Sequence, residues 1–171
     1  MAARVATATQ TRELIAAGES LNVEFKSSAR WTYRGQVSDP KLEHVIVKTI
    51  AGLMNAEGGT LLIGVDDRGQ VLGLEPDYQT LGKPNRDGYE LFLTQLLQAN
   101  LSGAALTLVR ISFSEIDGRD VCRVDVAASA QPVFARPIDG KHYSEFWVRI
   151  GNSTRQLVGT DMASYQREHW Y

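Results

Sequence analysis

Acidic side chains occur close to the expected ends of strands, where a fold can bring distant residues together. They are Glu19 and Glu24 in the segment ESLNVEFKSS, and Asp66 and Asp67 directly after the apolar run TLLIGV. Lys26 follows Glu24 at the next polar position of the same alternating segment. Carboxylate oxygens are the ligands that hard divalent cations prefer. Two interpretations are therefore open: a solvated face of a sheet, or an acidic site centred on a metal ion.

Several other kinds of site lack their usual signatures. The chain has no Gly-x-x-x-x-Gly-Lys-Ser/Thr loop and no Gly-x-Gly-x-x-Gly at the start of a helix, so ATP binding has little support. The histidines His44, His142 and His169 lack the i, i+4 pairing that suggests zinc, and surface or packing roles are favoured for them. Ser20, Ser27 and Ser28 have no base placed beside them by any motif, which argues against a catalytic triad.

The elements that must position these side chains show clear periodicity. Leu21, Val23 and Phe25 alternate with polar residues, which predicts a strand over residues 21–27 with these three side chains facing the core. Apolar residues at helical spacing predict a helix from Asp39-Pro40, as N-cap and first turn, to residue 57. The continuous apolar run at residues 60–65 predicts a central strand buried on both faces.

The second half of the chain predicts hairpins between helices. Residues 71–74 would form a hairpin with the central strand, and an amphipathic helix follows LGKPNRDG. Asp117-Gly118 is the favoured two-residue turn between strands at residues 106–116 and 119–126. Further strands are expected at VFAR and EFWVRI, then a turn at residues 151–155 and a final helix capped by Thr160. This order favours an α+β fold with a mixed, mostly antiparallel sheet packed by helices.

Length and composition bound the remaining possibilities. At 171 residues, with 43% apolar and 22% charged residues, the chain fits one folded domain, expected over residues 12–171 after a flexible tail at residues 1–11. The single cysteine, Cys122, excludes an internal disulfide and suits the cytoplasm and a place in the core. No signal peptide or membrane-spanning run is expected. The net charge of -2 implies that any nucleic-acid-binding surface is local.

Three motifs together resemble a known family. They are ESLNVEFKSS, KTIAGLMNAEGGTLLIGVDDRGQVLGL and FWVRIGNSTRQL, and they span about residues 12–158. The combination resembles the Schlafen-type AlbA domain, a family associated with nucleic-acid binding and, in an older label, with a divergent ATPase domain. The middle motif, Asn-x-x-Gly-Gly running into an apolar strand and Gly-Val-Asp-Asp, is the most specific part of the match.

The resemblance implies a metal-dependent endoribonuclease that cuts structured RNA such as transfer RNA or ribosomal RNA. By motif position the carboxylates would be Glu19, Glu24 and Asp67, with Asp66 as the alternative third ligand, holding Mg²⁺ or Mn²⁺. Lys26 could hold the scissile phosphate. Because five extended residues span about 16 Å, the chain must bend after Gly18 for Glu19 and Glu24 to share an ion.

Basic and hydroxyl side chains complete the expected interface. The candidate nucleic-acid-binding residues are Lys26, Arg30, Arg136, Lys141, Arg149, Ser153, Thr154 and Arg155. They would line a groove that binds RNA, or DNA, with strong salt dependence. The alternative is equally simple: basic residues on strands are usually a solvated face, and Gly-Asn-Ser-Thr-Arg can be an ordinary turn.

Two further readings remain beside the nuclease. The chain could be a non-catalytic DNA- or RNA-binding module with a regulatory or defence role, in which the acids are structural. An ATP-binding domain is a weaker third possibility, because the phosphate loop is missing. Large eukaryotic Schlafens join two such lobes, which leaves two hypotheses open for a single lobe: it pairs with a second copy as a homodimer, or it is the recognition part of a larger system.

Overall fold

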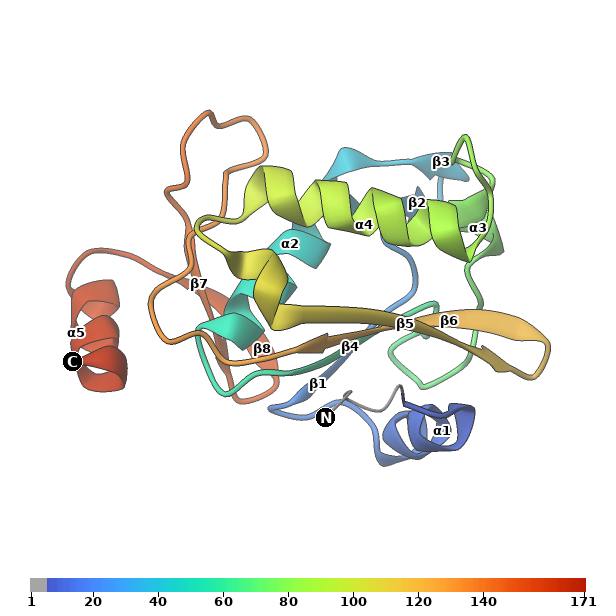
Figure 1. The fold of residues 1–171 in the computed structure, drawn as a ribbon, viewed down its shortest axis with the longest axis horizontal. Coiled ribbons are helices and arrows are strands. Elements are labelled where there is room, and N and C mark those ends of the chain that lie inside the picture. Colours follow the sequence, from blue (N-terminus) through green and yellow to red (C-terminus); the bar gives the residue numbers. More distant parts are fainter. Residues whose placement is uncertain (1–5) are drawn as a thin grey trace.

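The fold, a computed structural model that describes residues 6–171, is built around a four-stranded sheet with strand order β1-β4-β6-β5 (Figure 1). These strands are β1 (Val23–Lys26), β4 (Gly59–Ile63), β5 (Val109–Ile116) and β6 (Arg119–Val126). β1 runs parallel to β4, and the other neighbouring pairs are antiparallel. The prediction of an α+β fold with a mixed, mostly antiparallel sheet is confirmed.

Helices and short ladders surround this sheet. The helices are α1 (Ala8–Ala17), α2 (Pro40–Met54), α3 (Glu75–Tyr78), α4 (Arg86–Asn100) and α5 (Gly159–Trp170), with a 3-10 helix, η1, at Ala105–Leu108. The short ladders pair β2 (Trp31–Thr32) with β3 (Val37–Ser38), and β7 (Phe146–Ile150) with β8 (Ser153–Leu157). α2 and α4 pack on one face of the sheet, and apolar side chains of α1 pack on the other.

The central part of the chain folds as its local signals predict. The Asp39 side chain accepts a hydrogen bond from the Lys41 amide (2.9 Å) and so caps α2, as predicted. The predicted central strand is β4, which is buried between β1 and β6. Asp117 and Gly118 both have positive φ, as the tight turn between β5 and β6 requires. Cys122 lies in the core, and its burial raises the pKa of the thiol well above its usual value.

The Asn-x-x-Gly-Gly motif ends α2 through packing and hydrogen bonding. Asn55 is fully buried; its Nδ2 donates to the carbonyls of Val133 (2.8 Å) and Trp147 (2.9 Å), and its Oδ1 accepts from the Val133 amide (2.8 Å). A Cβ at Gly59 would collide with the Asn22 carbonyl oxygen. The motif therefore connects the end of α2 to β7 through Asn55, and Gly59 lets the chain pass close to Asn22, directly before β1. Because Asn55 makes these contacts as the C-cap of α2, the helix ends at Met54 and not at residue 57.

Some boundaries differ from the predictions at the start of the chain. The expected tail ends earlier, because Thr7 and Gln10 form a reciprocal capping box that starts α1 at Ala8; residues 1–5 of that tail lie outside the described residues. Leu21 lies in a turn and is 37% exposed, so its predicted core position is wrong. Residues 71–74 form only a single bridge, Val65 to Val71, in place of a full hairpin.

Differences at the end of the chain concern the last hairpin. The predicted turn at residues 151–155 is restricted to Gly151-Asn152, because Ser153 already begins β8. VFAR is not a strand; only Ala135 forms bridges, to Leu101 and Glu145. Thr160 lies inside α5, whose N-cap is Val158, so the predicted cap is wrong.

Candidate functional site

The polar residues of β1 are not a solvated face. Val23 and Phe25 pack toward α1, so Glu24 projects to the opposite side, toward the face of the sheet that α2 and α4 cover. Glu24 is only 8% exposed. A carboxylate buried to this extent requires charge compensation, and the solvated-face interpretation is therefore wrong for this strand.

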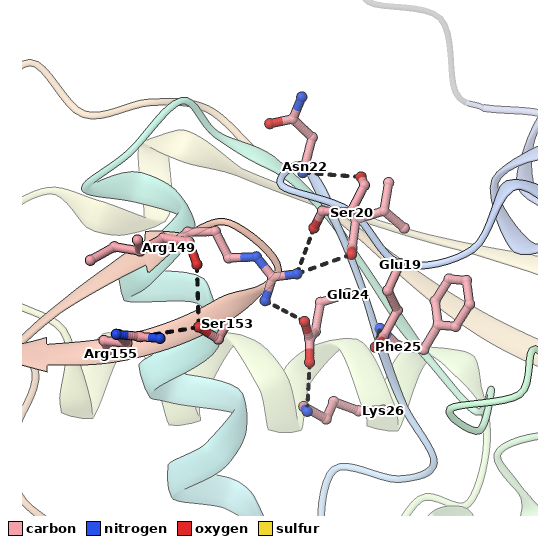
Figure 2. A network of polar contacts seen from close by, with 11 residues as sticks. Glu19, Ser20, Asn22, Glu24, Phe25, Lys26, Arg149, Ser153 and Arg155 are labelled. Carbon is pink, nitrogen blue, oxygen red and sulfur yellow. Dashed lines mark hydrogen bonds and ion pairs between the residues drawn. The ribbon is translucent and has the colours of Figure 1, made fainter.

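Arg149 of β7 supplies that compensation (Figure 2). Its Nη1 donates to Glu24 Oε2, and its Nη2 donates to the carbonyls of Ser20 (2.6 Å) and Val23 (3.2 Å). Lys26 Nζ donates to the other carboxylate oxygen of Glu24 at 2.7 Å. Arg149 is itself 3% exposed, so it cannot serve as the exposed phosphate ligand that the sequence predicts.

Glu19 comes near Glu24 through the predicted bend. A turn at Leu21-Asn22, closed by the Ser20 amide donating to the Val23 carbonyl (2.9 Å), reverses the chain. The Glu19 carboxylate then accepts a hydrogen bond from the Phe25 amide at 2.9 Å. The bend exists, but Glu19 and Glu24 bond to different partners (Figure 2).

The aspartates after β4 form a turn of their own. Asp66 Oδ1 accepts from the amides of Arg68 and Gln70, each at 2.9 Å, and Asp67 is exposed at the same turn. In the part of the chain that the structure describes, no group of three or more His, Cys, Asp or Glu side chains is placed to hold a metal ion. Glu19, Glu24 and Asp66 each accept from different donors, and the sharing of a Mg²⁺ or Mn²⁺ ion by Glu19, Glu24 and Asp67, or with Asp66 as the third ligand, stays a prediction.

The β7–β8 register separates the hydroxyl and basic residues that the sequence places in one loop. Thr154 pairs with Arg149, whereas Arg155 pairs with Val148 and Ser153 with Ile150. Because residues opposite each other in an antiparallel ladder project to the same side, Ser153 and Arg155 lie on the other side of the hairpin from Arg149. Arg155 is exposed and donates through Nε to Ser153 Oγ (3.3 Å).

Residues 136–144, which we call the basic arm, project beyond the end of α4 (Figure 1). Bridges of Ala135 to Leu101 and Glu145 fix its base. The Arg136 guanidinium lies 4.9 Å from the Tyr143 ring centroid, and Lys141 is exposed. Tyr143 is 40% exposed and donates through its hydroxyl to the Ala99 carbonyl at 3.3 Å. The arm therefore presents the half-buried Arg136 beside a partly exposed aromatic ring, and it carries a second cation, Lys141, that is exposed.

A second cation–aromatic pair lies where the arm meets α2. Lys48 Nζ is 4.9 Å from the Trp147 ring centroid, and His44 Nε2 is 3.3 Å from Glu145 Oε1. Lys48 and Tyr143 were not among the residues predicted from the sequence; for Tyr143, the polar segment between VFAR and EFWVRI was the available signal. Arg30 is engaged elsewhere, with Glu43 at 3.4 Å and the Phe92 ring at 5.0 Å.

One cavity of the protein lies away from the predicted site residues. A cavity of about 790 Å³ lies between the start of α1 and strands β5 and β6, and its walls contain none of those residues. No helix in residues 6–171 has the length and apolar character needed to cross a membrane.

The sheet order and helix placement define an α+β domain in which the edge strand β1 bonds through Glu24 to Arg149 of the β7–β8 hairpin. The sequence model of the family described as Schlafen, AlbA_2 matches residues 19–158, and the chain belongs to this family. No curated protein sequence matches the chain.

Solved structures share this fold. The crystal structure of the DIP2311 protein from Corynebacterium diphtheriae is 20% identical, with a TM-score of 0.61, over 94% of this chain and 28% of that one. The chain thus spans little more than a quarter of that protein. The solution structure of the N-terminal domain of a protein from Nitrosomonas europaea, described as a putative ATP-dependent DNA helicase RecG-related protein, is 21% identical. Its TM-score is 0.53, over 90% of this chain and 95% of that one.

Proposed function

We propose that this chain is a nucleic-acid-binding module that contacts phosphates and unpaired bases through the basic arm, with RNA favoured over DNA. The arrangement of Arg136, Lys141 and Tyr143 on one projecting segment carries the proposal. Membership of the Schlafen AlbA_2 family and the fold shared with a helicase-related domain support it.

The chemistry of the arm suits single-stranded segments. Aromatic rings stack on bases without regard to sequence, at about 1 to 3 kcal/mol per base, and neighbouring cations bind the phosphates. Tyr143 keeps one part of its ring accessible while its hydroxyl is held by the Ala99 carbonyl, so the ring is already oriented. Arg155 and Lys26 are further candidates for phosphate contacts. Lys26 would contact a phosphate while its ammonium group also bonds to Glu24.

Binding without hydrolysis is favoured because two of the three predicted catalytic acids, Glu19 and Glu24, already accept hydrogen bonds within the chain. Glu24 is bonded to Arg149 and Lys26, and Glu19 to the Phe25 amide. In this arrangement both oxygens of Glu24 and one oxygen of Glu19 already accept hydrogen bonds within the chain. The non-catalytic reading leaves these bonds in place.

Substitution of the arm tests the proposal by fluorescence anisotropy with labelled single-stranded RNA, transfer RNA and duplex DNA. We expect the pair Arg136→Ala and Lys141→Ala to weaken binding of all three by roughly 10-fold and to flatten the salt dependence. Tyr143→Ala should weaken single-stranded RNA binding by roughly 5- to 100-fold, with a smaller effect on duplex DNA.

The matched control removes two exposed cations elsewhere. Lys83 lies just before α4 at the end opposite the arm, and Arg110 lies on β5, so the pair Lys83→Ala and Arg110→Ala changes the net charge equally. We expect this control to bind about as well as the unmodified chain. An equal loss of affinity in both double variants would contradict a role for the arm. Homodimer formation stays a prediction, and light scattering showing a strict monomer with and without RNA would refute it.

A further inference from the structure

We propose that the acidic site of β1 is a guanidinium site, filled by Arg149 of the chain's own β7 strand in place of a divalent metal. The proposal does not depend on the nucleic-acid function. It concerns the oxygen atoms around Arg149: the carboxylate of Glu24 and the main-chain carbonyls of Ser20 and Val23.

The geometry of these oxygens suits a planar fork of N–H donors. One terminal nitrogen of Arg149 bonds to Glu24 while the other bonds to both carbonyls, so three oxygens accept from a single guanidinium. Arginine binds in this way because its donors have fixed directions. Mg²⁺ instead demands six oxygens in near-octahedral geometry at about 2.0 to 2.1 Å and usually retains several waters. The Arg149 side chain, which is only 3% exposed, closes the site and leaves no room for such waters.

The charges around Glu24 also disfavour a divalent ion. Arg149 and Lys26 donate to different oxygens of Glu24, so both oxygens of this carboxylate already have a cationic partner. A divalent ion that bound Glu24 would lie beside these two like charges in a poorly solvated place, which is unfavourable. The third predicted ligand, Asp67, is exposed on the turn after β4.

The hairpin that brings Arg149 is itself fixed against α2. A Cβ at Gly52 would lie 2.9 Å from Thr154 Cγ2 and 3.4 Å from the Arg149 amide nitrogen, so only a glycine lets the hairpin approach this closely. Thr154 pairs with Arg149 across the hairpin. The backbone therefore places the guanidinium against β1, independently of any ligand.

Chemical rescue tests the proposal. In the Arg149→Ala variant of the full chain, we expect a lower Tm that ethylguanidinium at about 20 mM partly restores, because a ligand that binds only the folded state raises stability. Ethylammonium at the same concentration and Mn²⁺ should not restore it, and the Tm of the unmodified chain should respond to none of the three. Rescue by Mn²⁺ and not by ethylguanidinium, or no selective rescue at all, would overturn the proposal.

A second measurement covers the case in which Arg149→Ala does not fold. Mn²⁺ is titrated into the unmodified chain and into Glu24→Gln, which keeps an oxygen acceptor for Arg149, and bound Mn²⁺ is followed by electron paramagnetic resonance. We expect the same weak binding by surface carboxylates in both. One equivalent of tightly bound Mn²⁺ in the unmodified chain that disappears in Glu24→Gln would show a metal site and refute the guanidinium assignment. Neither measurement contains nucleic acid, so failure here leaves the proposed binding function to its own test.

Discussion

Replacing Arg149 by alanine is expected to lower the free energy of unfolding by about 3 to 5 kcal/mol, the usual cost of leaving one member of a buried ion pair without its partner. The substitution leaves the 8%-exposed carboxylate of Glu24 with Lys26 alone and leaves the carbonyls of Ser20 and Val23 without their donor. Urea denaturation followed by tryptophan fluorescence and circular dichroism measures the change.

A double-mutant cycle separates this pair from general damage. We expect Glu24→Ala to be costly as well, and the double variant to cost clearly less than the sum of the single ones, because the uncompensated charge is then gone. Lys26→Ala is the control; it removes the more exposed partner of Glu24 and should cost about 1 kcal/mol or less. Additive single effects, or an Arg149→Ala cost as small as that of the control, would contradict the coupling.

Asn55→Ala is expected to have an effect of similar size. The amide of Asn55 bonds to both backbone groups of Val133 and to the Trp147 carbonyl from a fully buried position. Each buried polar group left without a partner costs about 1 to 3 kcal/mol, so a total of about 3 to 5 kcal/mol is expected after partial relaxation. The same denaturation experiment measures it.

Two variants control for the Asn55 substitution. Asn55→Asp keeps the acceptor for the Val133 amide but loses the donors, so it should also be destabilised. Asn100→Ala removes one hydrogen bond, to the Leu96 carbonyl, near the end of α4 and should cost about 1 kcal/mol. If Asn55→Ala cost no more than Asn100→Ala, the account of the Asn-x-x-Gly-Gly motif as a tie between elements would be wrong.

The parts of the fold that follow from local chemistry were predictable from the sequence. The Asp39-Pro40 start of α2, the buried run of β4 and the Asp117-Gly118 turn each depend on residues close together in the chain. Errors arose where long-range packing decided the outcome. Ser153 begins a strand because it pairs with Ile150, which the turn-like sequence Gly-Asn-Ser-Thr-Arg conceals.

The site could be predicted only in part, for the same reason. Alternation in ESLNVEFKSS correctly indicates a strand, but periodicity cannot say what covers its polar side. The covering residue, Arg149, lies 125 positions from Glu24 in the sequence, and no local signal links the two. The resemblance to Schlafen-type domains correctly implied the family, while the metal ligands carried over with it stay a prediction, because the motif does not indicate that Glu24 bonds to Arg149.

The most direct test of the account is the metal dependence of its interaction with RNA. End-labelled transfer RNA and single-stranded RNA are incubated with the full chain in Mg²⁺, Mn²⁺ or EDTA, and both affinity and strand integrity are measured. We expect intact RNA in every case, and binding by the basic arm that depends on ionic strength but not on a particular divalent ion. Cleavage that requires Mg²⁺ or Mn²⁺ and is lost in Glu24→Gln would contradict this expectation.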